Sequence, residues 1–288
     1  MPTRRRRAPR RARTRPRGLG RDPRALYEAA VQSVDFDLDF IERVYRTWRG
    51  RRFERFREDF CATAALAAGW VLRRPAHRAW AVDLDPAPLA WCRRHRLPAM
   101  RAAARRLTLL RRDVRRVAGP RVDAIAALNF SYWVFKRRHE LVDYFRAARR
   151  ALRRDGILVV NAFGGSEAMA DLTEKRQIAA SQAVDGTPIE RFTYEWEHES
   201  FNVVDHHMVC HIHFRFRDRS AIRRAFSYDW RLWTLPEVRE AMLEAGFCRA
   251  EIYLEGWNEK KNEGDEIFRR RRYFENQLGW LAYVVGLR

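Results

Sequence analysis

Short apolar runs that are typical of buried strands alternate with helical segments five times between residues 53 and 165. Strands that are separated by helices cannot pair as hairpins, so they align in parallel and the helices pack on both faces of the sheet. The sequence therefore predicts an α/β fold built on a parallel sheet. The runs are FERFREDF (53–60), RAWAVDLD (78–85), LTLLRRDV (107–114), VDAIAALNF (122–130) and ILVVNAFGG (157–165).

The pattern changes after the fifth run. In residues 191–233, aromatic and β-branched side chains alternate with polar ones, which predicts an antiparallel insertion after the fifth strand. Residues 235–247 then return to helical spacing, and residues 258–276 have the charged composition of a loop or irregular helix.

Two further apolar runs, at residues 248–256 and 279–288, complete the predicted sheet. Residues 25–50 form a helical lead-in before the first strand. We therefore expect one domain over residues 25–288, with a seven-stranded, mostly parallel sheet.

The basic charge of the chain is concentrated at its N-terminus. The chain holds 58 Lys and Arg against 37 Asp and Glu, and its net charge is +21. Residues 1–24 hold 11 Arg and one Asp without apolar periodicity, so we expect a disordered, Arg-rich tail. The tail is an electrostatic arm for nucleic acid or a membrane surface, or a solvated tail, or the product of a start codon assigned too far upstream.

The cysteines and the hydropathy pattern bear on the compartment. Cys61, Cys92, Cys210 and Cys248 form no C-x-x-C pair, which favours reduced thiols in the cytoplasm. The chain has no apolar run long enough for a membrane span, and no apolar signal-peptide region follows the N-terminal arginines. We expect a cytoplasmic protein with no membrane partner.

Carboxylates stand at the ends of three predicted strands, where ligands of open parallel sheets bind. They are Glu58, Asp83 and Asp113. Asp83 follows Ala62 by 21 residues, near the spacing at which an acidic side chain accepts the hydroxyls of a ribose. Because the chain has no G-x-G-x-x-G motif, a dinucleotide-dependent oxidoreductase is disfavoured.

In this order the features resemble the class I S-adenosylmethionine-dependent methyltransferases over residues 25–288. The segment REDFCATAA (57–65) resembles the first motif of that family, with Glu58 as its acidic residue. AVDLDPAPLAW (81–91) resembles the second motif, whose acid would be Asp83, and LNFSYWVF (128–135) stands at the fourth. The resemblance implies a Rossmann-like fold, methyltransferase activity and S-adenosylmethionine as cofactor. It implies that the cofactor-binding residues are Glu58, Phe60, Cys61, Ala62, Asp83, Asp113 and Asn129.

The first motif lacks the glycines that the family has at three positions, which are Phe60, Ala62 and Ala64 here. S-adenosylmethionine has no phosphate to lie against the backbone, so an alanine with a negative φ could be accommodated by a slightly wider loop. If Ala62 instead closes the site, the chain is a non-catalytic relative that acts as an interaction module.

Aromatic residues near the fourth motif and in the insertion predict an acceptor pocket. We interpret Tyr132, Trp133 and Trp230 as substrate-binding residues and the insertion as a lid, and ordinary core packing or cross-strand pairing is the alternative. NFSY (129–132) loosely resembles the NPPY-type motif of amino-group methyltransferases. The predicted acceptor is a small molecule, and the charge leaves a nucleic-acid methyltransferase or binder as the alternative.

The stretch DHHMVCHIHF (205–214) places His207, His211 and His213 on one face of a strand. Residues i and i+2 of one strand lie about 7 Å apart, which is poor geometry for one metal ion, so we predict no metal site. We predict that His211 and Tyr132 are the catalytic residues, with solvated or packed histidines as the alternative.

Overall fold

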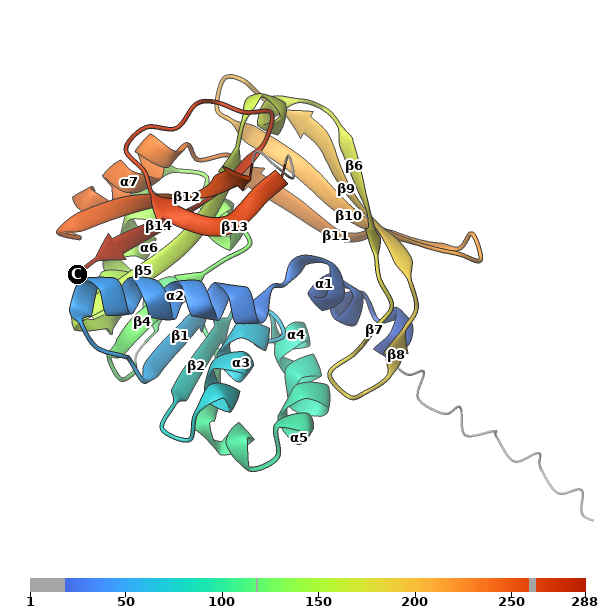
Figure 1. Ribbon diagram of the computed structural model, residues 1–288, viewed down its shortest axis with the longest axis horizontal. Helices are drawn as coiled ribbons and strands as arrows, with labels where there is room; N and C mark the ends of the chain where they lie inside the picture. The colour runs from blue at the N-terminus through green and yellow to red at the C-terminus, as the bar shows by residue number, and fades with distance from the viewer. Residues whose placement is uncertain (1–18, 118, 259–262) are drawn as a thin grey trace, which may run out of the picture.

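A computed structural model describes residues 19–117, 119–258 and 263–288. Its main sheet has eight strands in the order β13-β12-β14-β5-β4-β1-β2-β3 (Figure 1). The five parallel strands are β1 (Arg55–Asp59), β2 (Arg78–Asp83), β3 (Leu107–Arg111), β4 (Val122–Ala127) and β5 (Leu152–Gly164). The antiparallel strands are β12 (Arg249–Asn258), β13 (Glu263–Arg270) and β14 (Trp280–Leu287).

Helices cover both faces of this sheet, as the apolar runs predict. One face packs against α2 (Val34–Arg49), α3 (Ala65–Arg73) and α4 (Pro86–Trp91), and α5 (Leu97–Met100) follows on that side. The other face packs against α6 (Arg138–Ala151) and α7 (Leu235–Glu244). The chain leaves β1 toward β2 and later returns to β4 on the other side of β1, so the crevice beyond the carboxyl ends of β1 and β4 is the expected ligand site.

The insertion forms a second sheet, which we call the lid. It contains β6 (Thr173–Ile178), β9 (Phe192–Phe201), β10 (His207–Phe216) and β11 (Ala221–Arg231) in the antiparallel order β11-β10-β9-β6. A small hairpin of β7 (Ser181–Gln182) and β8 (Pro188–Ile189) lies between β6 and β9. The lid therefore begins at Thr173, earlier than the predicted residue 191.

The N-terminal boundary of the domain also lies earlier than predicted. Residues 19–24, which we assigned to the tail, are folded: Leu19 is buried, and Asp22 caps α1 (Pro23–Val31) by accepting from the amide of Arg24 at 2.9 Å. Residues 1–18 of the predicted tail lie outside the described residues. In Figure 1, α1 lies between the lid and the helices of the main sheet.

The segment 258–276 contains a strand, β13, rather than the predicted loop or irregular helix, so the main sheet has one strand more than expected. The α/β class, the mostly parallel sheet and the antiparallel insertion are confirmed. Within the described residues, no helix is long and apolar enough to cross a membrane.

Candidate active site

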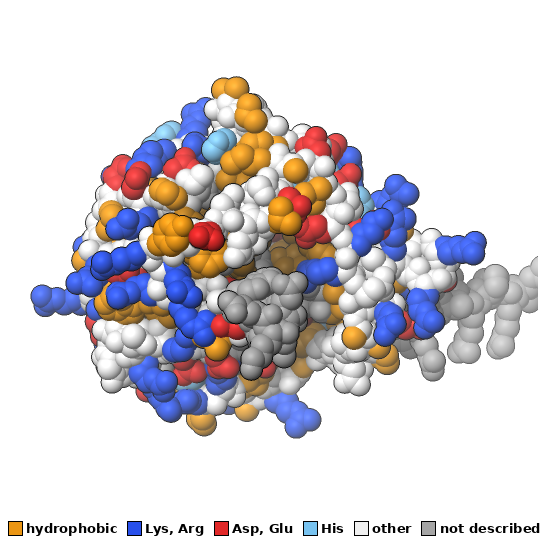
Figure 2. Space-filling model, turned by 45° about the horizontal axis from the view of Figure 1, so that its top comes forward, with side chains coloured by type: hydrophobic (Ala, Val, Ile, Leu, Met, Phe, Trp, Pro, Cys, Tyr) orange, Lys and Arg blue, Asp and Glu red, His pale blue; other side chains and the backbone are white. Residues whose placement is uncertain are grey.

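Two cavities lie beyond the carboxyl ends of β1, β2 and β4. The first, of about 260 Å³, is bounded by the β1–α3 loop and α1, and we call it the cofactor cavity. The second, of about 370 Å³, lies between β5 and the lid, and we call it the acceptor cavity. Tyr27, Asn129 and Tyr228 line both cavities, so the two are adjacent. Figure 2 shows a hollow lined by hydrophobic side chains on the face that it displays.

The β1–α3 loop adopts the backbone of a glycine loop without glycines. Phe60, Ala62 and Ala64 have φ of 55°, 44° and 57°. The left-handed region is unfavourable for residues with a Cβ atom, so the loop is held by its surroundings. The accommodation considered above, an alanine with a negative φ in a slightly wider loop, is therefore not the one that the structure adopts.

Glu58, the last residue but one of β1, lines the cofactor cavity and is only 7% exposed. Its carboxylate accepts a 2.8 Å hydrogen bond from the amide of Ala67 in the first turn of α3. Burial raises the pKa of Glu58 to about 8, although the Ala67 amide and Arg96 oppose the shift. A cation in this cavity would favour the ionised carboxylate.

Asp83 ends β2 and faces the same cavity. One carboxylate oxygen accepts from the amide of Ala62 at 2.7 Å, and the other accepts from the amide of Asp85 at 2.9 Å. Burial is the main cause that raises the pKa of Asp83, and the backbone hydrogen bonds oppose it. Asp83 thus joins the glycine-poor loop to the end of β2.

The lead-in helix α1 closes the cofactor cavity with three side chains that sequence reasoning did not single out: Arg24, Tyr27 and Gln32. Glu28 attaches this helix to the loop, because it accepts from the hydroxyl of Thr63 and from the guanidinium of Arg96. The only advance signal was the amphipathic pattern of the helix, which does not distinguish a wall of a site from a core face.

Aromatic rings dominate the acceptor cavity. Lid strands contribute Trp196, Tyr228 and Trp230, and the main sheet side contributes Phe130 and Phe163. The rings of Tyr228 and Trp230 stack with their centroids 4.2 Å apart.

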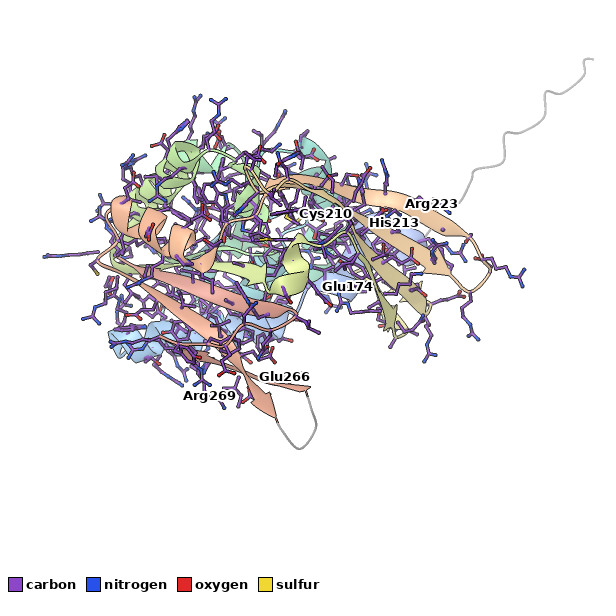
Figure 3. The ribbon with its side chains drawn as sticks, turned by 90° about the horizontal axis from the view of Figure 1, so that it is seen from above. Glu174, Cys210, His213, Arg223, Glu266 and Arg269 are labelled. Carbon is purple, nitrogen blue, oxygen red and sulfur yellow. The ribbon has the colours of Figure 1, made fainter. Side chains whose placement is uncertain are left out.

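Polar side chains complete the walls of the acceptor cavity. Glu174 and Arg176 come from β6, where Figure 3 labels Glu174, and His198 comes from β9. His198 is 8% exposed, and burial lowers its pKa, although Glu174 opposes the shift. The imidazole therefore favours its neutral form.

Solved structures share this fold at low sequence identity. A methyltransferase from Clostridium acetobutylicum that depends on S-adenosylmethionine has 16% identity and a TM-score of 0.63, over 91% of this chain and 96% of that one. A sugar N-methyltransferase from Streptoalloteichus has 17% identity and a TM-score of 0.61, over 98% of this chain and 99% of that one.

An amino pentose methyltransferase from Micromonospora echinaspora, solved with S-adenosylmethionine, has 18% identity and a TM-score of 0.62, over 91% of this chain and 95% of that one. The chain has the class I methyltransferase fold. No protein-family model and no curated protein sequence matches it.

The methyltransferase fold brings together most of the predicted cofactor residues. Phe60, Ala62 and Asn129 line the cofactor cavity with Glu58 and Asp83. Cys61 does not, because its side chain is 1% exposed and packs in the core below the loop, where burial raises the pKa of the thiol.

Asp113 also lies apart from the cofactor cavity. Its carboxylate accepts from the amide of Arg115 at 2.9 Å and from the guanidinium of the same residue at 2.7 Å. This hydrogen-bonded ion pair lowers the pKa of Asp113. Asp113 is therefore a partner of Arg115 in this structure, and the lining of the cavity gives no support to its predicted role in cofactor binding.

The predicted acceptor residues separate into three positions. Trp230 lines the acceptor cavity, whereas Trp133 is fully buried behind it, with its ring 5.9 Å from that of Trp230. Tyr132 is fully buried and packs against Phe145 of α6, away from both cavities. The structure therefore places Tyr132 outside the candidate site and gives no support to the prediction that it is catalytic.

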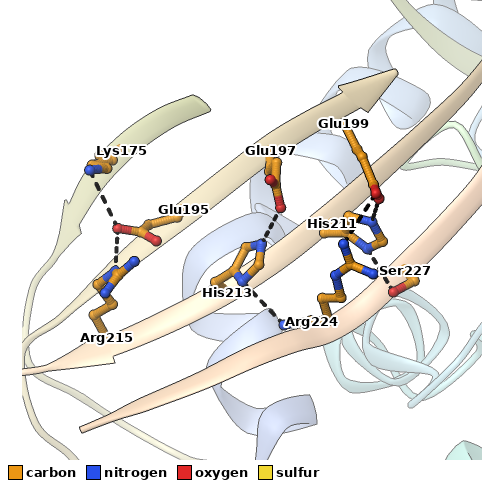
Figure 4. Close-up of polar contacts among 9 residues, drawn as sticks. All are labelled: Lys175, Glu195, Glu197, Glu199, His211, His213, Arg215, Arg224 and Ser227. Atoms are coloured by element: carbon orange, nitrogen blue, oxygen red, sulfur yellow. Dashed lines mark hydrogen bonds and ion pairs between the residues drawn. The ribbon is translucent and has the colours of Figure 1, made fainter. Parts of the chain in front are cut away.

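The predicted catalytic histidine, His211, lies on the opposite face of the lid from the acceptor cavity. In Figure 4 it bonds to Glu199 and Ser227, while the neighbouring His213 bonds to Glu197 at 2.8 Å. Neighbouring residues of a strand point to opposite faces of the sheet. Ile212 lines the cavity, so His211 points to the outer face of the lid. The structure therefore gives no support to the prediction that His211 is catalytic, and the histidine that lines the cavity is His198.

The outer face of the lid carries a ladder of polar contacts that includes these histidines. Three glutamates of β9 face Lys, Arg or His side chains of the neighbouring strands, and Glu195 bonds to Arg215 at 2.6 Å (Figure 4). Within the described residues, no group of three or more His, Cys, Asp or Glu side chains could hold a metal ion.

Proposed function

We propose that this chain transfers a methyl group from S-adenosylmethionine to an amino group of a small-molecule acceptor. The observation that carries the proposal is the pair of adjacent cavities: one is lined by buried carboxylates, and the other is lined by aromatic rings. Tyr27, Asn129 and Tyr228 lie where the contents of the two cavities would meet.

The residues of the cofactor cavity fit the charge of S-adenosylmethionine. When bound, this cofactor supplies a methyl group that its sulfonium has already activated. Glu58 and Asp83 give the cavity negative charge to face the sulfonium and the ammonium, and a cation beside Glu58 would offset the cost of burying its carboxylate. Asp83 is the residue that would bind the ribose hydroxyls, while Ala62 fixes its carboxylate.

The walls of the acceptor cavity suit an amine. Aromatic faces attract an ammonium group, and Glu174 adds a carboxylate at the edge of the cavity. His198 is the base of the proposed mechanism: its neutral imidazole would take one proton from the ammonium and leave a neutral amine, which is the form of the acceptor that can receive a methyl group. Two of the similar structures are an amino pentose methyltransferase and a sugar N-methyltransferase, which supports this acceptor class.

Radioactive methyl transfer tests the proposal. The full chain is incubated with S-adenosylmethionine labelled in its methyl group and with amino sugars, the corresponding hydroxyl sugars, or RNA. We expect label in the amino sugars only, and loss of transfer in Asp83→Ala. Label in the hydroxyl sugars or RNA would contradict the amine proposal, and a wild-type chain that binds no cofactor would contradict methyl transfer altogether.

A further inference from the structure

Gln32, at the C-terminal end of α1, presents an unsatisfied amide to the cofactor cavity. It lines the cavity, and its backbone N–H closes the last turn of α1 by donating to Glu28. The side-chain Oε1 atom is buried and has no hydrogen-bond donor among the residues that the structure describes. Buried polar atoms nearly always have a partner, so an orphaned amide in a ligand cavity indicates a partner that arrives with the ligand.

The position of α1 decides which end of the ligand Gln32 meets. The N-terminal end of the helix is fixed beside α4, where Asp22 accepts from the indole of Trp91 at 3.1 Å. The other end of α1 leads directly into α2, whose first residue, Val34, packs against Gly69 of α3: a Cβ atom on Gly69 would lie 2.5 Å from the Val34 side chain. The amide of Ala67 in α3 holds Glu58, so Gln32 lies on the Glu58 side of the cavity and not on the α4 side.

The other end of the cavity has the residues suited to a nucleoside. Asp83, Asp85 and Pro88 line it at the end of β2 and the start of α4. A ligand whose ribose meets Asp83 and whose methyl group faces Tyr27 and Tyr228 therefore extends its remaining part toward Glu58 and Gln32. In S-adenosylmethionine that part is an amino acid, with one ammonium and one carboxylate.

We propose that the side-chain amide of Gln32 binds the amino-acid end of the cofactor, which rests on the proposed function above. A primary amide offers one acceptor oxygen and two N–H donors, so it can accept from the ammonium and donate to the carboxylate. Glu58 supplies the charge at this end, and Gln32 supplies the paired donor and acceptor. The C-terminal end of α1 then makes the cofactor site bind a ligand with an amino-acid end more tightly than a thioether that lacks it.

Two ligands separate this role from general packing. S-adenosylhomocysteine contains the amino-acid end, whereas 5′-deoxy-5′-methylthioadenosine has the same adenosine and thioether without it. Their affinities are measured by calorimetry on the full-length wild type and on Gln32→Met, which keeps an unbranched side chain and removes the amide. We expect Gln32→Met to bind S-adenosylhomocysteine roughly tenfold to a hundredfold more weakly and methylthioadenosine unchanged.

Gln182→Leu is the matched control, because Gln182 is exposed in β7 and lines neither of the two cavities. Thermal unfolding of each variant establishes that it is folded. Equal losses for both ligands, or no loss for either, would overturn the role of Gln32 while leaving the proposed function intact. A wild type that binds neither ligand would overturn both.

Discussion

At the scale of single residues, Glu58 makes the stability of the chain depend on pH. Its pKa is about 8 in the folded state against an ordinary value of 4.5, so between these values the folded chain keeps a proton that the unfolded chain has released. The free energy of unfolding must therefore fall as pH rises from about 4.5 to about 8.

Glu58→Gln should remove this fall. We expect the variant and the wild type to be nearly equal in stability at about pH 4.5, and the variant to be more stable at about pH 8, by roughly 1 kcal/mol or more. Urea unfolding of the protein without ligand at both pH values measures the difference. A difference that stays constant with pH would show that Glu58 ionises normally in the folded chain.

Ala62 offers a second test at this scale. Its φ of 44° is costly for a residue with a Cβ atom, and glycine relieves that cost while losing some chain entropy on folding. We expect Ala62→Gly to stabilise the protein by up to about 1 kcal/mol in the same assay.

Ala99→Gly is the comparison, because Ala99 is exposed in helix α5 and has an ordinary backbone. This variant should be destabilised by roughly 0.5 to 1 kcal/mol. If both variants lose stability equally, the loop carries no strain at Ala62.

At the scale of elements, the sequence reveals apolar strands better than polar ones. Strands β2, β4 and β5 are confirmed where apolar runs are nearly continuous and both faces are covered, and the edge strand β3 (LTLLR) is confirmed because it is also apolar. Strand β1 is confirmed although only Phe56 of RFRED is apolar. The edge strands β6 (TEKRQI) and β13 (EGDEIFRR) were missed because their residues are mostly polar, and β6 is exposed along almost its whole length. Such strands have a polar composition that resembles a loop.

The site shows the same division. Strand-end carboxylates follow from topology, so Glu58 and Asp83 could be placed in the cavity, but the side-chain hydrogen bonds that turn Asp113 toward Arg115 could not. Alternation along β10 correctly groups His211 with His213, yet it does not say which face meets the substrate. The residue that could have indicated this face is His198. It stands two residues after Trp196 on β9, so both side chains point to the same face of the lid, and Trp196 lines the acceptor cavity.

The two faces of the lid should therefore differ in function. With an amine acceptor, His198→Gln should lower kcat/KM by roughly a hundredfold or more near neutral pH, because the base is lost. The loss should shrink as pH rises and solvent deprotonates the amine.

His211→Gln should change kcat/KM only a few-fold, since its contacts are with Glu199 and Ser227. Calorimetry should give both variants the cofactor affinity of the wild type, and a pH-independent loss in His198→Gln would contradict its role as a base.

At the scale of the whole molecule, the net charge of +21 raises the question of nucleic acid. Residues 1–18 contain nine Arg and no acidic residue, while the acceptor cavity is lined mainly by aromatic side chains. A run of arginines binds phosphates without reading the base sequence, and such binding weakens steeply with salt. Residues 1–18 therefore supply +9 of the net charge of +21, and the remaining +12 lies in residues 19–288, which also hold the proposed site.

Deletion of residues 1–18 separates these two parts, because it keeps every contact described for residues 19–288. We expect the truncated chain to bind RNA at least roughly tenfold more weakly at low salt than the full chain, with a shallower dependence on salt concentration. Its affinity for S-adenosylhomocysteine should not change, since the lining of the cofactor cavity begins at Arg24. RNA binding that survives the deletion with its affinity and salt dependence intact would place a nucleic-acid site on the folded domain, and RNA would then become the first acceptor to test.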